Sequence, residues 1–286
     1  MQGRSFRQNQ NQDRIWLLAG TGDGPRLAAA LGRHGWQVTV SVVTAAASRP
    51  YAGLGLERIT VGPLQGPEAI VRTLQSEPAF LWVVDATHPF ASQISADLKQ
   101  ACVAADQPLL RFERPLEFGG TVRLLNGLAG LGRCSLDDQR VFLAIGGRHL
   151  PRAHAAVHAA GAEVFARCLP SADGLRQALA AGLPQNHLAV LRPLQGDVPG
   201  DIERALCRRW RIDSVVCRQS GGVTERLWRD LSGELDLTLL MLRRPAPPTG
   251  VVIVNSEEAL LRCLAGTHQS PVEIKPGRTV PALFWL

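Results

Sequence analysis

An acid, a hydroxyl and an imidazole follow one apolar run of the sequence within four residues. Asp85, Thr87 and His88 end the stretch FLWVVDATH, and Pro89 then opens a predicted helix. A carboxylate and an imidazole can hold or transfer a proton, so Asp85 and His88 are the candidate catalytic residues. The competing interpretation is that Thr87 or His88 caps the helix. Capping explains Thr87 fully, but it does not explain Asp85 and His88 together.

A glycine-rich turn follows the first apolar run, in AGTGDGPRLA at residues 19–28. Glycines after a first strand let the backbone approach a pyrophosphate, whose charge the helix N–H groups balance. The spacing departs from G-x-G-x-x-G because Pro25 stands where the third glycine is expected, and any tight turn needs glycine. The candidate cofactor contacts in this turn are Gly20, Thr21, Gly22 and Asp23.

The end of the second apolar run indicates which dinucleotide this turn would bind. An NAD site usually carries an acid here, about 20 residues past the glycine turn, for the ribose hydroxyl. Residues 41–49 read SVVTAAASR and contain no acid, but they do contain Ser41, Thr44 and Arg49. Hydroxyls and an arginine suit a 2′-phosphate, which favours NADPH over NADH. An ordinary polar loop is the alternative.

Two further strand ends carry small residues. AIGGRHL contains Gly146 and Arg148, and CRQSGG contains Ser220, Gly221 and Gly222. Small residues let a flat ligand or a phosphate come close to backbone N–H groups, although each segment also fits a plain turn. Because such ends occur in both halves of the chain, they favour a shared cleft between two domains.

Short apolar runs alternate with helical segments along most of the chain, which predicts an α/β fold of two Rossmann-like, doubly wound domains with parallel sheets. Helices are expected at 25–35, 67–77, 90–106 and 200–210. Strands are expected at 15–20, 37–43, 58–62, 80–86, 108–113, 141–147, 162–168, 187–193, 213–222, 237–245 and 251–255.

The pattern blurs between residues 114 and 140, where the domain boundary is expected. The predicted organisation is a disordered tail at 1–14, an N-terminal domain at 15–125 and a C-terminal domain at 126–286. The tail is polar and lacks the apolar stretch of a signal peptide.

The composition excludes several classes of protein. Apolar residues make up 45% and charged residues 20%, which suffices for a folded core. A net charge of +6, carried almost wholly by arginine on the basic side, suits an acidic substrate or nucleotide as well as simple solubility. Six scattered cysteines read as reduced core thiols of a cytoplasmic protein. No run is long enough to span a membrane, no nucleic-acid motif occurs, and His154 with His158 lacks a third metal ligand.

Several segments together resemble one family, the precorrin-6A reductases of cobalamin biosynthesis. They are LLAGTGDGPRLA, SVVT, VVDATHPFASQISADLKQAC, LLRFERP, VFLAIGGRHL, EVFARCLP, VVCRQSGG and RRP, in this order. DATHPFA is the most specific of them, and the resemblance runs from Ile15 to Pro245. The family often has a lysine in the last glycine loop, where this chain has Arg218 and Gln219.

The resemblance implies a two-domain reductase that uses NADPH to reduce one double bond of precorrin-6A, or of its cobalt form, to precorrin-6B. That tetrapyrrole carries many carboxylates, so Arg111, Arg114 and Arg148 are expected to bind it. Thr87, Gly146, Ser220, Gly221 and Gly222 are the other expected substrate contacts. Whether Asp85 and His88 supply a proton or only shape the site stays open, as do the presence of cobalt and the oligomeric state.

Two other classes also stay open at this point. One is a non-catalytic NADP-binding regulatory module, against which the DATHPFA run argues. The other is a methyltransferase of the same pathway, and the missing acid after the second strand counts against it, because a ribose diol usually needs one.

Overall fold

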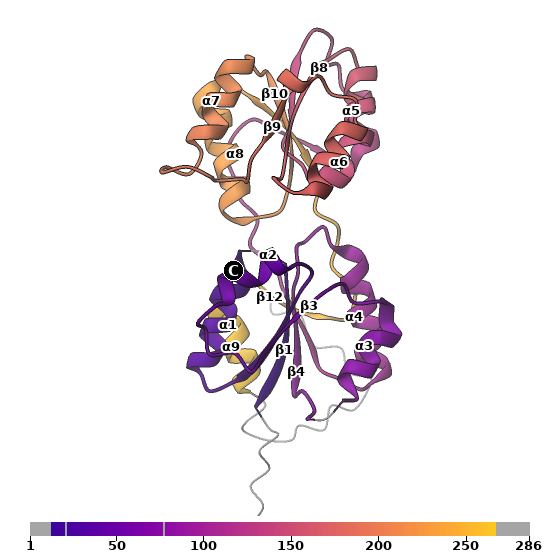
Figure 1. The fold of residues 1–286 in the computed structure, drawn as a ribbon, viewed down its shortest axis with the longest axis vertical. Helices are drawn as coiled ribbons and strands as arrows, with labels where there is room; N and C mark the ends of the chain where they lie inside the picture. Colours follow the sequence, from indigo (N-terminus) through magenta and orange to yellow (C-terminus); the bar gives the residue numbers. More distant parts are fainter. Residues whose placement is uncertain (1–12, 21, 77, 267–286) are drawn as a thin grey trace, which may run out of the picture. The chain divides into compact units, whose positions relative to one another are not determined.

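The computed structural model describes residues 13–20, 22–76 and 78–266. These residues form two compact units, one of 13–87, 93–113 and 248–266 and the other of 88–92 and 114–247. Each unit contains one six-stranded sheet in which every neighbouring pair of strands is parallel. The predicted α/β class with two parallel sheets is therefore confirmed (Figure 1).

The first sheet has the strand order β3-β2-β1-β4-β5-β12. Its strands are β1 (Arg14–Ala19), β2 (Gln37–Val42), β3 (Arg58–Val61), β4 (Trp82–Ala86), β5 (Leu109–Phe112) and β12 (Val252–Val254). Its helices are α1 (Asp23–Arg33), α2 (Ala45–Ser48), α3 (Gly66–Leu74), α4 (Ser92–Ala104) and α9 (Glu257–Ala265), with the 3-10 turn η1 (Arg49–Tyr51).

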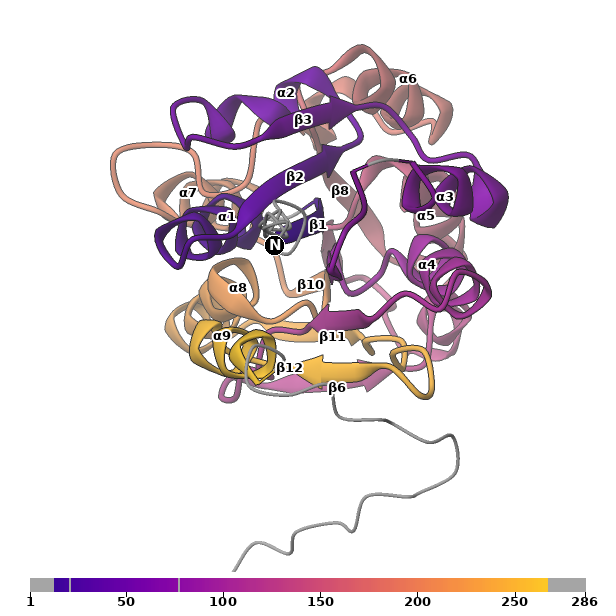
Figure 2. The same ribbon diagram turned by 90° about the horizontal axis from the view of Figure 1, so that it is seen from below.

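Helices cover both faces of this sheet because successive residues of a buried strand point to opposite sides. Ile15 and Leu17 pack toward α1 and α9, while Trp16 and Leu18 pack toward α3 and α4. Figure 2 shows α1 and α9 on one side of the sheet and α3 and α4 on the other. This double cover explains why β1 reads as a continuous apolar run.

The second sheet has the order β9-β8-β7-β10-β11-β6. Its strands are β6 (Val122–Leu125), β7 (Arg140–Leu143), β8 (Glu163–Cys168), β9 (Leu188–Val190), β10 (Ser214–Arg218) and β11 (Thr238–Leu242). Its helices are α5 (Leu150–Ala159), α6 (Ala172–Ala180), α7 (Asp201–Trp210) and α8 (Gly222–Leu235), with the 3-10 turns η2 (Leu128–Arg133), η3 (Gly147–His149) and η4 (Gln185–His187). Helices α5 and α6 bury one face, and α7 and α8 bury the other.

The two sheets share one topology. In each, the first strand of the repeating unit lies centrally, as β1 or β7, and the chain reverses its direction of travel across the sheet at that strand. Five strands of each sheet are consecutive in the chain, β1–β5 in the first and β7–β11 in the second. The sixth strand lies at the edge beside β5 or β11: β12 follows the second unit in sequence, and β6 precedes β7. This arrangement puts a topological switch point between β1 and β4, and another between β7 and β10.

The division of the chain differs from the expected 15–125 and 126–286. The units change at Glu113 and Arg114, and residues 248–266 belong to the first unit because β12 is hydrogen-bonded to β5. Strand β6 lies in the region that shows no clear pattern in the sequence. Arg14, expected in the tail, begins β1, and residues 1–12 lie outside the described part of the chain. The cleft expected between the domains stays a prediction.

The cysteines can be compared directly with the expectation. All six cysteines are free, and five of them are buried, as expected of core thiols. Within the described residues, no helix combines the length and apolar character needed to cross a membrane. The same part of the chain has no group of three or more potential metal ligands among His, Cys, Asp and Glu.

Candidate functional site

The switch point of the first sheet holds the predicted cofactor turn. Ala19 and Ala86 are paired at the carboxyl ends of β1 and β4, and Gly20 follows directly. A Cβ atom added to Gly20 or Gly22 would meet no atom within 4 Å, so the backbone of this turn is open to a ligand. Helix α1 begins at Asp23, which places its free N–H groups at the same point. Thr21 lies outside the described residues.

Gly24 takes the part that the missing third glycine plays in the usual motif. A Cβ atom at Gly24 would overlap the Tyr51 hydroxyl and lie 2.7 Å from the Cβ atom of Ala19. Only glycine therefore lets α1 pack this closely on β1. The departure from G-x-G-x-x-G is a shift of this packing glycine by one position.

The predicted phosphate contacts at the end of β2 and just after it divide between the interior and the surface. Ser41 is buried, and its hydroxyl accepts a hydrogen bond from Trp16 Nε1 at 2.8 Å and lies 2.6 Å from Thr60 Oγ1. Thr44 is exposed and caps α2 by accepting from the Ala47 N–H at 3.2 Å. Arg49 is exposed at the start of η1. Of the three predicted phosphate contacts, Thr44 and Arg49 are thus at the surface, whereas Ser41 is buried and already hydrogen-bonded within the protein.

Asp85 and Arg111 form a buried ion pair. They are register partners on the adjacent strands β4 and β5, and each is only 2% exposed. Arg111 Nη1 lies 2.7 Å from Asp85 Oδ2, 3.0 Å from Thr87 Oγ1 and 2.9 Å from Ser95 Oγ. Asp85 Oδ1 accepts from the Thr87 hydroxyl at 2.7 Å and from the Thr87 N–H at 3.0 Å. The structure brings these predicted site residues together with one another, inside the protein.

The expected helix cap is wrong in position. Helix α4 begins at Ser92, so Ala91 precedes it rather than Thr87 or His88. The Thr87 hydroxyl serves the Asp85–Arg111 pair instead. The His88 ring forms a local turn, in which Nδ1 accepts a hydrogen bond from the Phe90 N–H at 3.2 Å.

The short segment His88–Ser92 belongs to the second unit, although the chain on both sides of it belongs to the first. Phe90 packs against the apolar core on the α5 and α6 side of the second sheet. His88 and Phe90 line a cavity of about 360 Å³ with Gly146, Gly147 and Arg148. This cavity lies at the carboxyl ends of β7 and β10, the switch point of the second sheet, where ligands bind in such folds.

A larger cavity of about 700 Å³ lies beside the first and shares Phe90, His149 and Arg218 with it. Its other lining residues come mainly from the segments after β6 and β11. No carboxylate is among the described residues that line it, whereas its cationic or titratable groups are His149, Arg152, Arg218, Arg243 and Arg244. Such a surface suits a ligand with several carboxylates.

Burial and neighbouring arginines disfavour the positively charged forms of Arg218 and His149, so an anionic ligand at this site would relieve an unfavourable interaction. The guanidinium of Arg218 lies 5.1 Å from the centre of the Phe90 ring, and burial and then Arg148 lower the pKa of Arg218. Its Nε is buried and has no hydrogen-bond partner among the described residues. Burial lowers the pKa of His149 as well, followed by Arg218, Arg152 and Arg148, so His149 is neutral at pH 7.

The last glycine loop has its N–H groups already engaged. Gly221 N donates to Glu225 Oε2 at 2.7 Å, and Gly222 N donates to Glu117 Oε1 at 3.1 Å. A Cβ atom on Gly221 would lie 2.6 Å from the Pro115 carbonyl oxygen, so glycine is needed there for packing. Arg114 donates to the Gly221 carbonyl at 3.3 Å, and Ser220 is buried beside it. The predicted substrate contacts Arg114, Ser220, Gly221 and Gly222 thus lie together. The N–H groups of the two glycines, however, already donate to Glu225 and Glu117.

Most of the residues that line the larger cavity have no role predicted from the sequence. His149 follows the predicted Arg148, and Arg218 lies two residues before the predicted Ser220, so both lie beside residues that the sequence indicates. Arg243 and Arg244 lie near the end of the predicted strand 237–245 and directly follow β11. Arg152 and Phe90 carried no signal of a strand end, because a helix and a short segment bring them to the site.

Comparison with known proteins identifies the family. The family model for precorrin-6x reductase CbiJ/CobK matches residues 14–265. The chain belongs to the precorrin-6A reductase family. A cobalt-precorrin-6A reductase from Synechocystis sp. is 32% identical over 244 residues, which cover 83% of this chain and 91% of that protein. A precorrin-6A reductase from Mycobacterium tuberculosis is 32% identical over 256 residues, which cover 88% and 98%.

A solved structure of CobK precorrin-6A reductase has the same fold, with a TM-score of 0.72 and 28% identity, and the match covers 91% of this chain and 99% of that one. The predicted family, fold class and oxidoreductase activity of this precorrin-6A reductase family member are confirmed. The matches also make a nicotinamide cofactor a reasonable expectation for a reductase.

Proposed function

We propose that this protein reduces one carbon–carbon double bond of precorrin-6A, or of its cobalt form, with NADPH as reductant. The observation that carries the proposal is the arginine-lined cavity at the second switch point, together with an open glycine turn at the first. Membership in the family supports the reaction, and the relatives at 32% identity include proteins named for both forms of the substrate. Their names therefore do not favour either form.

The first unit fits a nicotinamide dinucleotide. Gly20 and Gly22 leave open space beside the backbone, and α1 offers its N-terminal N–H groups to a pyrophosphate. Thr44 and Arg49 are exposed after β2, where no acid stands to bind a ribose diol. These features favour NADPH, and when bound the reduced nicotinamide supplies a hydride.

The second unit is less suited to a second dinucleotide. At its switch point the N-terminus of α8, which follows β10, is closed to a phosphate, because the carboxylates of Glu225 and Glu117 occupy its first N–H groups. We therefore assign the cofactor to the first unit and the tetrapyrrole to the second.

The arginines of the second unit bind and orient the substrate. Arg218, Arg152 and Arg148 present guanidinium groups to the two cavities, and each can hold a carboxylate with two hydrogen bonds. Several such contacts fix a rigid ring at several points, which orients one double bond. Phe90 excludes water from the wall that the two cavities share.

His88 is the residue we assign to proton transfer. Its Nδ1 accepts from the Phe90 N–H, so a neutral His88 ring carries its proton on Nε2. That ring lines the smaller cavity, where the Nε2 N–H can hold a water beside a carbon atom of a bound ligand, and the carbon takes its proton from solvent through that water. His149, whose pKa burial and three arginines lower, lies on the wall that both cavities share.

The test is anaerobic turnover of the purified protein with NADPH and each form of precorrin-6A. We expect oxidation of NADPH that depends on the tetrapyrrole, and a product heavier by two hydrogen atoms. Binding of NADPH without turnover of either form would contradict the proposal and favour a non-catalytic module. Transfer of a methyl group from S-adenosylmethionine would favour the methyltransferase.

A further inference from the structure

In the sequence, buried Asp85 precedes and its partner Arg111 follows the five-residue segment His88–Ser92, which belongs to the second unit although the chain before and after it belongs to the first. We propose that Asp85 and Arg111 are positioning residues that hold both ends of segment His88–Ser92, and so set His88 and Phe90 in the substrate cavities. The inference rests on the function proposed above. It assigns to this pair a role that involves no contact with the substrate.

Arg111 contacts the chain at both ends of segment His88–Ser92. The chain leaves the first unit after Thr87 and returns to it at Gln93. Arg111 Nη1 lies 3.0 Å from the hydroxyl of Thr87, on the outgoing side, and 2.9 Å from that of Ser95, on the returning side. One buried guanidinium nitrogen therefore fixes the start and the end of the same short segment.

Asp85 holds Arg111 and Thr87 in this arrangement. Its Oδ2 accepts from Arg111 at 2.7 Å, and its Oδ1 accepts from both the hydroxyl and the N–H of Thr87. Glu113 Oε1 accepts from Arg111 Nε at 3.2 Å, which sets the plane of the guanidinium. The outgoing backbone is thereby fixed at the residue that immediately precedes His88.

Asp85 and Arg111 are poorly placed to contact the substrate themselves. Both side chains are about as buried as core residues, and neither lines the two cavities described above. The residues they hold do line them: His88 the smaller cavity, and Phe90 both. A misplacement of about 1 Å at a reacting group can cost on the order of 100-fold in rate, so accurate anchoring of this segment matters for turnover.

A double-mutant cycle separates positioning from a general structural role. Asp85→Asn keeps the shape of the side chain but removes its charge, and we expect kcat/KM for the tetrapyrrole to fall roughly 10- to 100-fold, with the Kd for NADPH unchanged. In a background that already carries His88→Ala and Phe90→Leu, the same change should cost less than about threefold, because the positioned groups are gone. Equal costs in both backgrounds would overturn the inference.

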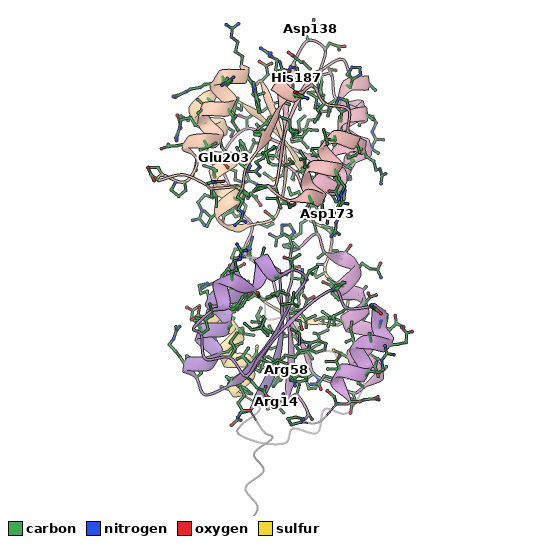
Figure 3. The ribbon with its side chains drawn as sticks, in the orientation of Figure 1. Arg14, Arg58, Asp138, Asp173, His187 and Glu203 are labelled. Carbon is green, nitrogen blue, oxygen red and sulfur yellow. The ribbon has the colours of Figure 1, made fainter. Side chains whose placement is uncertain are left out.

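A milder variant and a matched control keep the test decisive. Thr87→Val removes one hydroxyl and leaves the ion pair intact, so it should give a smaller loss with the same dependence on background, even if Asp85→Asn fails to fold. Glu57→Gln weakens another ion pair of the first sheet, in which the exposed Glu57 pairs with the buried Arg14. Arg14, labelled in Figure 3, begins β1 and so lies at the strand end opposite the switch point. Glu57→Gln should lower the free energy of unfolding and leave kcat/KM unchanged. A fall in kcat/KM equal to that of Thr87→Val would also overturn the inference.

A readout without turnover distinguishes this inference from the proposed function. Amide hydrogen exchange of the free protein should accelerate at His88, Phe90, Ala91 and Ser92 in the Asp85→Asn variant, and not in Glu57→Gln. If wild-type protein reduces neither substrate but this exchange pattern appears, the proposed function fails and the anchoring role stands. Unchanged exchange in the segment would overturn the anchoring role even in an active enzyme.

Discussion

The guanidinium of Arg218 lies over the ring of Phe90, 5.1 Å from its centre, where the two cavities of the second unit meet. Arg218 ends β10, whereas Phe90 comes from a segment that follows a strand of the other sheet. The contact orients a cation whose buried Nε has no hydrogen-bond partner among the described residues. Arg218 is therefore the residue whose replacement should be most informative about substrate binding.

Arg218→Gln should raise the KM for the tetrapyrrole more than it lowers kcat, because a carboxylate contact holds the ground state and the transition state alike. Loss of a hydrogen bond to a charged group costs about 1.5–3 kcal/mol, or roughly 10- to 100-fold. Steady-state kinetics measure this effect. Arg208→Gln is the matched control, since Arg208 is exposed on α7 and pairs with Glu234. Equal KM values for wild type and Arg218→Gln would remove Arg218 from the site.

Arg49→Ala should weaken NADPH and leave NADH nearly unchanged, because only NADPH has the 2′-phosphate that this exposed arginine would contact. The expected loss is about 1.5–3 kcal/mol in NADPH binding, measured by fluorescence titration of both cofactors. Arg72→Ala, which removes an exposed arginine from α3, should change neither affinity. A wild-type preference for NADH would contradict the proposed cofactor outright.

The pKa of His149 predicts a specific pH dependence of stability. Burial and three arginines hold it below its ordinary value of 6.5, so the unfolded chain takes up this proton at a higher pH than the folded one. Above about pH 6.5 His149 is unprotonated in both states and does not change the free energy of unfolding. Below that pH the free energy of unfolding decreases, because the unfolded chain binds the proton more tightly than the folded protein does. Urea unfolding of wild type and His149→Gln should show the wild type losing more stability between pH 7 and 5. Parallel pH profiles for the two proteins would contradict the prediction.

Two glycines of the cofactor turn should respond differently to alanine. Gly24→Ala places a methyl group against Tyr51 and Ala19, and such overpacking costs about 1–3 kcal/mol of stability. Gly22→Ala meets no atom within 4 Å and has φ at −62°, so the melting temperature should not fall. If the pyrophosphate approaches this turn, Gly22→Ala should instead weaken NADPH binding. An unstable Gly22→Ala protein would show that the turn needs glycine for its own structure.

The sequence predicted most strands and the glycine turn because these depend on local chemistry. A strand covered on both faces is apolar along most of its length, as β1 and β4 are apart from Arg14 and Asp85, and a close strand-to-helix turn must contain glycine. Strand β6 was missed because it lies at an edge, where partial exposure breaks the apolar run. The final strand was placed in the wrong half because an apolar run specifies a strand but not its partner.

The sequence by itself determined the class of fold, the two parallel sheets and the family, since period, turn chemistry and ordered motifs are all properties of neighbouring residues. Only the tertiary structure decided that Asp85 faces Arg111 inside the protein, because register between β4 and β5 joins residues 26 positions apart. It also decided that Arg152, Arg218 and Arg244 line one cavity. Parallel strands end at one edge of a sheet, so residues remote in sequence meet there, and no local pattern records which of them will do so.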